Sequence, residues 1–180
     1  MAVAPLLGIA AFLSCCDLGR AAGGLMLQAA LPAAHVSVPF NAGVAGSSAE
    51  AEFSVLRADL YAFTLEYMFR EGDREDQERV RRLVEGIDLR QYPPQYLDEG
   101  LSIPVRLSVS RRDEGQPWSV KDGISTKQVP YSFGATSVSR RIEPAWLTPG
   151  RYLARIETLG NVPELRGTSA RFRVGKSHFK

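Results

Sequence analysis

Hydrophobic side chains alternate with other residues along one central stretch of the chain, residues 60–69, which is LYAFTLEYMF. Large apolar side chains occupy every second position of this stretch: Tyr61, Phe63, Leu65, Tyr67 and Phe69. A period of two is that of a β-strand, and aromatic residues favour strands. Five large side chains on one face need a second layer to cover them. The pattern therefore predicts a strand at the centre of a two-layer body.

Similar alternation recurs along the rest of the chain and predicts further short strands, at residues 36–40, 52–58, 101–109, 136–142, 152–156 and 170–174. Residues 118–133 give weaker strand signals, around Val120 and around residues 129–131. Turn residues such as Pro149-Gly150 separate these runs. The fold class predicted is mainly β, a two-layer antiparallel β-sandwich of the Ig-like type.

One segment departs from the strand pattern and predicts a short amphipathic helix over residues 74–85, inserted after the central strand. Asp73 is a residue type that caps helix N-termini, and Gly86 is one that ends helices. Apolar residues recur between them at helical spacing: Val80, Leu83 and Val84. The connection that follows, residues 86–100, is long for a compact domain.

The overall composition is that of a globular protein, with 44% hydrophobic and 23% charged residues among 180. The formal net charge of +2 is too small to indicate a nucleic-acid partner. The length suits one domain with an additional segment. We predict that residues 35–176 form the sandwich, that residues 177–180 are a tail, and that residues 1–34 are an export signal followed by an Ala/Gly-rich linker.

The first 16 residues are almost wholly apolar, and the first charge is Asp17. This run is shorter than the ~20 residues of a membrane-spanning helix. Its length matches the ~7–15-residue apolar core of a signal peptide, although no Lys or Arg precedes it. We therefore expect an exported protein, either periplasmic or anchored to a membrane by an N-terminal lipid.

Two routes of processing are open. Small residues at Gly19 and Ala21 suit an ordinary signal-peptidase cut before Ala22. Alternatively, residues 13–16, Leu-Ser-Cys-Cys, resemble a lipobox, with Cys16 or Cys15 as the lipid acceptor. Lipid attachment, the second route, would explain why the chain has two cysteines at the end of its apolar run. No cysteine follows Cys16, so the body has no disulfide, thiol nucleophile or cysteine-ligated metal.

The residues that carry common catalytic chemistry are scarce. The only histidines, His35 and His178, lie near the ends of the predicted domain, which argues against a Ser-His-Asp site and against a histidine-based metal site. No phosphate loop or dinucleotide motif occurs, and no cofactor is expected. Glu66 is the one carboxylate within the central predicted strand, residues 60–69, and we expect it to point outward or to form an ion pair. Catalysis by paired carboxylates stays open.

Aromatic residues in or beside predicted loops are the main candidates for a binding site. They are Tyr92, Tyr96, Trp118, Tyr131, Phe133 and Trp146, with Arg166 as a candidate cation. Aromatic and arginine side chains often anchor protein or sugar partners.

The sequence of the C-terminal half, from YSFGATSVSRR to ARFRVG, resembles those of an uncharacterised family of small exported proteobacterial proteins, known as a domain of unknown function. The resemblance covers about residues 38–175, and its most specific piece is VPELRGT, residues 162–168. It implies a β-sandwich and a location in the cell envelope. It implies no activity and no catalytic residues.

These observations favour a non-catalytic binding module of the bacterial envelope that engages a protein partner through loop aromatics and arginines. A narrower form of this hypothesis is an immunity protein against a toxin delivered by another cell. A carbohydrate-binding module on the same fold is the alternative, and it predicts a strip of exposed rings.

Overall fold

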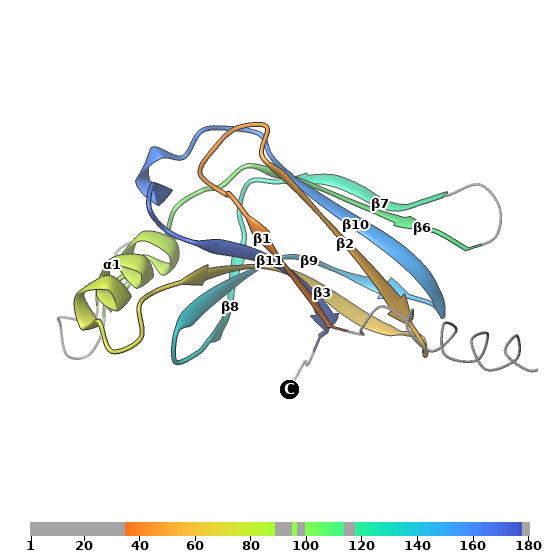
Figure 1. Cartoon of the computed structure of the whole chain (residues 1–180), viewed down its shortest axis with the longest axis horizontal. Helices are drawn as coiled ribbons and strands as arrows, with labels where there is room; N and C mark the ends of the chain where they lie inside the picture. Colours follow the sequence, from red (N-terminus) through yellow and green to blue (C-terminus); the bar gives the residue numbers. More distant parts are fainter. Residues whose placement is uncertain (1–34, 89–94, 97–99, 114–117, 178–180) are drawn as a thin grey trace, which may run out of the picture. The chain divides into compact units, whose positions relative to one another are not determined.

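The computed structural model describes residues 35–88, 95–96, 100–113 and 118–177, all within one compact unit of the chain. These residues form two antiparallel sheets packed face to face, with a single α-helix at one end (Figure 1). The predicted fold class, a mainly β sandwich with one helix, is confirmed. No helix among the described residues is long and apolar enough to cross a membrane.

Each sheet takes strands from several parts of the sequence. The first sheet has the order β1–β11–β3–β9–β8, with β1 at Val36–Phe40, β11 at Ala170–Lys176, β3 at Asp59–Met68, β9 at Ser137–Leu147 and β8 at Val129–Phe133. The second has the order β2–β10–β6–β7, with β2 at Ser48–Val55, β10 at Gly150–Thr158, β6 at Val105–Arg111 and β7 at Trp118–Ser125. Two short strands, β4 (Ile87–Asp88) and β5 (Gln95–Tyr96), pair with each other.

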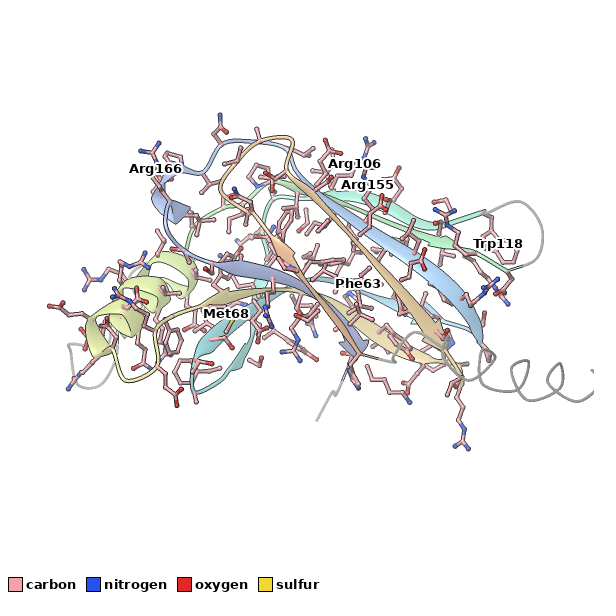
Figure 2. The ribbon with its side chains drawn as sticks, viewed as in Figure 1. Phe63, Met68, Arg106, Trp118, Arg155 and Arg166 are labelled. Carbon is pink, nitrogen blue, oxygen red and sulfur yellow. The ribbon has the colours of Figure 1, made fainter. Side chains whose placement is uncertain are left out.

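Strand β3 lies at the middle of the first sheet, as the alternation predicts, and its large side chains are buried between the sheets. Aromatic packing joins the two layers. The ring of Phe53 from the second sheet lies 5.8 Å from that of Tyr61 and 6.4 Å from that of Phe63, both in the first sheet. Within the first sheet, the rings of Phe63 and Phe172 stack at 6.5 Å. Figure 2 shows Phe63 between the layers.

Helix α1 spans Arg74–Glu85, the predicted bounds, because both of its ends are specified locally. The Asp73 side chain accepts a hydrogen bond from the backbone N–H of Asp76 at 2.9 Å. Gly86 takes a left-handed conformation, with φ of 68°, and its N–H donates to the carbonyl of Arg82. Val80 and Val84 are fully buried and attach the helix to the core.

Other boundaries differ from the sequence prediction. Strand β6 begins at Val105, because the preceding residues run against the end of α1, where the N–H of Leu101 donates to the carbonyl of Leu83 at 3.0 Å. Gly100 allows this approach, since a Cβ there would lie 2.1 Å from the Val84 carbonyl oxygen. Strand β2 begins and ends earlier than residues 52–58.

The ambiguous region, residues 118–133, forms two strands in different sheets. Its periodicity is weak because β7 lies at an edge and points Lys121 inward, where the ammonium group bonds Glu143 of the other sheet at 2.8 Å. The apolar side chains of Val120 and Ile124 are exposed instead. An inward charge is one way in which an edge strand resists pairing with another chain.

Glu66 lies on the outer face of β3 and forms the expected ion pair. Its carboxylate accepts hydrogen bonds from Arg173 at 3.0 Å and from the Ser137 hydroxyl at 2.9 Å. The same face of β3 carries Thr64, which is only 6% exposed. The centre of the sheet's outer face is therefore less exposed to solvent than its polar residues would suggest.

Arg140 is the buried cation of the described core and is 2% exposed. Its guanidinium group donates to backbone carbonyl oxygens of Val84 at 2.9 Å, Leu101 at 2.8 Å and Gln128 at 2.9 Å. These carbonyls belong to the last turn of α1, the approach to β6 and the link between β7 and β8. One side chain thus connects three segments, and its positive charge meets the negative end of the helix dipole.

Replacing this cation tests its structural role. Arg140→Met removes the guanidinium donors from three carbonyls, those of Val84 and Gln128 buried and that of Leu101 partly buried, and we expect a loss of about 3 kcal/mol in the free energy of unfolding. Urea denaturation followed by circular dichroism measures it. The matched control, Arg171→Met on the exposed side of β11, should change stability by less than about 0.5 kcal/mol. Equal effects of the two substitutions would contradict the role assigned to Arg140.

A second pair of substitutions separates a satisfied buried hydroxyl from an unsatisfied one. Tyr67 is fully buried, its hydroxyl has no hydrogen bond with the described residues, and burial raises its pKa despite the nearby charge of Arg140. Tyr152 is also buried, but its hydroxyl donates to the carbonyl of Thr148 at 2.8 Å. Thermal or urea unfolding should show Tyr67→Phe to be neutral or stabilising and Tyr152→Phe to lose about 0.5–1.5 kcal/mol. The reverse order would refute this assignment.

Candidate functional site

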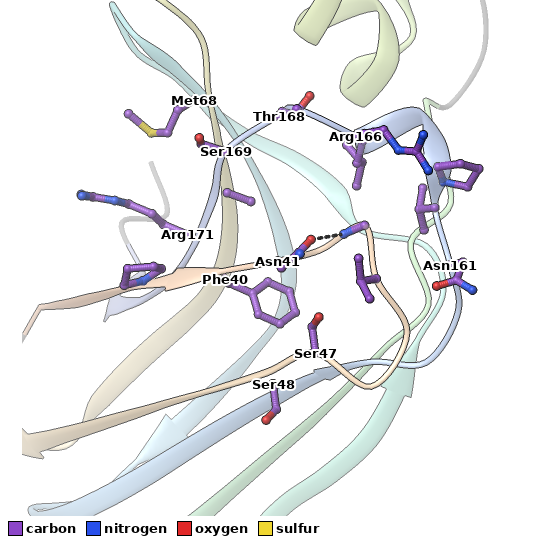
Figure 3. Close-up of a pocket in the computed structure, with 18 residues that line it drawn as sticks. Phe40, Asn41, Ser47, Ser48, Met68, Asn161, Arg166, Thr168, Ser169 and Arg171 are labelled. Carbon is purple, nitrogen blue, oxygen red and sulfur yellow. Dashed lines mark hydrogen bonds between the residues drawn. The ribbon is translucent and has the colours of Figure 1, made fainter.

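A large hollow lies at the helix end of the sandwich (Figure 3). We call it the basic hollow. It has a volume of about 1360 Å³ and is lined by residues from 39–48, from 161–171 and by Met68. Two loops, β1–β2 and β10–β11, therefore form most of its wall. Loops held by a rigid scaffold are where binding residues most often occur.

Hydrogen bonds of asparagine side chains and of the backbone shape the first loop and join it to the second. The Asn41 side chain accepts from the N–H of Gly43 at 3.2 Å, and that of Asn161 accepts from the N–H of Ala45 at 3.0 Å. The N–H of Val162 donates to the Gly43 carbonyl at 3.0 Å. A Cβ at Gly43 would lie 3.3 Å from both Val162 and Leu165, so glycine permits the close approach of the loops.

The VPELRGT segment folds as a compact turn on one wall of the hollow. Pro163–Leu165 is one turn of 3₁₀ helix, with proline in its first position, where no N–H is required. Val162 and Leu165 are buried and anchor the turn, and Gly167 takes a φ of 78° that favours glycine. This arrangement leaves Arg166 exposed beside the hollow.

The charged side chains that line the basic hollow have one sign. They are Arg166 and Arg171, and among the described lining residues none is Asp or Glu. Neither arginine forms an ion pair with another described residue. Glu164, on the same turn as Arg166, lines a separate depression against α1. The remaining polar groups are asparagine amides and Ser or Thr hydroxyls.

Helix α1 supports the VPELRGT wall through a chain of hydrogen bonds. The Arg79 guanidinium donates to the Thr168 hydroxyl at 3.0 Å and to the Asp76 carboxylate at 2.7 Å. Asp76 also accepts from the backbone N–H of Arg70 at 2.9 Å. That backbone bond, followed by the bond from Arg79, lowers the pKa of Asp76 below its ordinary value. Asp76 therefore fixes Arg79, which in turn contacts the loop.

The aromatic candidates do not form a cluster of rings in contact with one another on the described surface. The Trp118 ring lies 5.1 Å from the guanidinium of Arg111, and the Tyr131 ring lies 5.5 Å from that of Arg141. Trp146 is 65% exposed at the end of β9. No ring contact joins any two of these three among the described residues.

Phe133 is 49% exposed, with its ring 6.3 Å from that of Phe69 and 4.1 Å from the Arg81 guanidinium of the helix. Tyr92 and the side chain of Tyr96 lie outside the described residues, as do His178, Cys15 and Cys16. Arg166 is thus the one sequence candidate that the structure places at the hollow.

Other residues of the hollow escaped the sequence analysis, above all Asn41, Asn161 and Arg171. The one sequence signal that pointed to this region is the VPELRGT motif, which the sequence analysis uses only as evidence of family resemblance. No group of three or more described His, Cys, Asp or Glu side chains could hold a metal ion.

Comparisons with known proteins give a family and a fold. The family model described as "Domain of unknown function (DUF5625)" matches residues 37–176. No curated protein matches the chain. A crystal structure of a protein from Sulfurospirillum deleyianum is similar with a TM-score of 0.65 and 19% identity, over 81% of this chain and 98% of that protein. At this identity the similarity concerns the fold alone.

The support that Asp76 gives to the loop can be tested by pH. Because the folded pKa is lowered, its contribution to stability is complete above the ordinary pKa near 3.8 and disappears as the pH falls through the lower folded value. We expect Asp76→Asn to lower stability at pH 7 and to reduce the loss between pH 5 and 2. Urea unfolding across this range measures both effects.

Glu75→Gln is the matched control, since it removes the same charge from the same helical turn at an exposed position that has no side-chain hydrogen bond with another described residue. Amide NMR signals of residues 163–169 should shift in Asp76→Asn and stay in place in Glu75→Gln. Identical behaviour of both variants would show that Asp76 does not hold the loop.

Proposed function

We propose a binding function for this chain, which belongs to the DUF5625 family, a family described as a domain of unknown function. This match confirms the resemblance to an uncharacterised family that the sequence indicates. In our proposal the protein is a non-catalytic module of the bacterial envelope that engages a protein partner. The basic hollow is its binding site, and an acidic segment of the partner is its ligand.

The observation that carries this proposal is the charge of the hollow. Arg166 and Arg171 line it without a carboxylate among the described lining residues. Several other surface arginines are neutralised, as in the pairs Arg173–Glu66 and Arg155–Glu50. An arginine without a partner is available to a carboxylate of a ligand, which it can bind through two parallel hydrogen bonds.

The size of the hollow favours a segment of polypeptide over a small molecule. Its volume of about 1360 Å³ exceeds the roughly 300–1,000 Å³ of typical small-molecule pockets. Arginine is also enriched at protein interfaces. An extended acidic segment could contact both arginines and the amides and hydroxyls between them.

The proposal of a non-catalytic role is supported by what the lining lacks. Ser47, Ser48 and Ser169 present hydroxyl groups, but a serine nucleophile needs an adjacent base. The described lining contains neither His nor a carboxylate, and His35 lies at the opposite end of β1.

The alternatives make different demands on the same surface. A carbohydrate-binding module needs a strip of exposed rings, whereas Trp118, Tyr131 and Trp146 have no contact with one another. An immunity protein is a narrower form of our proposal, in which a toxin provides the acidic segment. The envelope location is supported by the apolar run of residues 1–16.

Charge reversal at the hollow tests the proposal. Acidic peptides, with Asn/Gln versions of the same peptides as controls, are titrated into the protein and followed by NMR. We expect shifts at residues 161–171 for the acidic peptides alone, and an affinity at least about tenfold lower for the double variant Arg166→Glu/Arg171→Glu, equivalent to about 1.4 kcal/mol.

The matched control is Arg57→Glu, an exposed arginine in the β2–β3 turn at the other end of the sandwich, which should bind acidic peptides as the native chain does. Unchanged affinity in the double variant, or shifts confined to another face, would refute the assignment of the hollow. Affinity should also fall with added salt, because the contacts are between charges.

A further inference from the structure

The end of the sandwich opposite the basic hollow gathers several strand ends. Strand β2 ends at Val55, which pairs with Gly150, the first residue of β10. Strand β3 begins at Asp59, opposite Leu147, the last residue of β9. Trp118, at the start of β7, pairs with Arg111 at the end of β6. Figure 2 shows Trp118 and Arg166 at opposite ends of the body.

Large apolar side chains are exposed at this end. Leu56 in the β2–β3 turn is 71% exposed, Trp146 near the end of β9 is 65% exposed, and Trp118 is 55% exposed. The two tryptophans are the only ones in the chain. We call this region, defined by Leu56, Trp118 and Trp146, the tryptophan end. Tryptophan has an apolar body with a polar N–H and favours the boundary between water and lipid.

Basic residues surround the exposed side chains. Arg57, Arg112 and Arg151 are exposed, and Lys176 and Arg111 are half-buried. The acidic groups described at this end are already bonded: Asp59 pairs with Lys176 at 3.1 Å, and Asp113 accepts from Arg111 and from the backbone N–H of Arg151 at 2.9 Å. The described part of this end therefore has an excess of positive charge, which suits anionic lipid headgroups.

The chain also enters the sandwich at this end. Val36, the first residue of β1, pairs with Val174, and His35 lies over Gly175, where a Cβ would come within 2.5 Å of its Nδ1 atom. The neighbouring Lys176 pairs with Tyr61, near the start of β3. The described part of the chain thus begins beside the tryptophan end.

We propose that the tryptophan end docks on the surface of a lipid bilayer containing anionic headgroups. Trp118, Trp146 and Leu56 enter the interface, and the arginines around them contact phosphates. The basic hollow, at the other end, then faces the aqueous phase. This inference depends neither on the ligand of the hollow nor on the site of lipid attachment.

The native tryptophans serve as the probe. The full chain is mixed with vesicles of phosphatidylethanolamine and phosphatidylglycerol, some carrying brominated acyl chains, which quench tryptophan in contact with lipid. Trp118→Phe and Trp146→Phe each leave one tryptophan to report. We expect the emission of both to move to shorter wavelength, to be quenched by the brominated lipid, and to lose accessibility to acrylamide.

Charge reversal supplies the second measurement. Arg57→Glu/Arg112→Glu should lower the partition of the chain into anionic vesicles at least about tenfold. Arg166→Glu/Arg171→Glu at the basic hollow should leave partition unchanged. The second variant also separates this inference from the proposed function, since it should weaken peptide binding alone.

Two outcomes would overturn the inference. If the chain sediments with vesicles while both tryptophans stay unquenched and accessible to acrylamide, residues 1–34 alone hold the membrane. If the emission shifts with protein concentration and without vesicles, a second copy of the chain covers this end.

Discussion

The rings of Phe53, Phe63 and Phe172 fill the space between the two sheets, and the rest of the structure depends on that packing. Side chains of a strand alternate between faces, so a shift of one residue in β3 would turn its buried rings outward. The packing therefore fixes the register of β3 against β9 and β11, and with it the positions at which the strands end. Both functional surfaces proposed here are built at strand ends, one at each end of the same core.

The helix end is coupled to this core by two arginines with different tasks. Arg140 is buried and bonds backbone carbonyls from three segments, including the last turn of α1. Arg79, on the same helix, bonds Thr168 of the VPELRGT turn. The wall of the basic hollow thus rests on a helix that is itself fixed by a charge inside the sandwich. A loop supported in this way loses less conformational entropy on binding than a free loop does.

The sequence predicts the elements whose signals are local. Strand β3 has an unbroken period of two, and α1 has a cap at each end. Prediction from the sequence fails where tertiary contacts determine the structure. Strand β7 points Lys121 inward because the ammonium group pairs with Glu143 in the other sheet, and β6 begins late because the N–H of Leu101 bonds the end of α1. The basic hollow belongs to this second class. Only the folded arrangement of β1, β10 and β11 places Asn41, Asn161 and Arg171 around one hollow. No short sequence motif contains all three residues.

The distribution of charge explains why composition alone is a poor guide here. A net charge of +2 and an excess of arginine are equally compatible with a neutral surface of ion pairs and with a specific anion site. The structure separates these cases by pairing. Arg106, Arg155 and Arg173 each contact a carboxylate on a sheet face, whereas Arg166 and Arg171 line the hollow without one. Paired surface arginines contribute little to stability and little to recognition. Arg166 and Arg171 line one concavity from two different walls (Figure 3), and the proposal of an acidic ligand rests on that placement, which the number of arginines does not reveal.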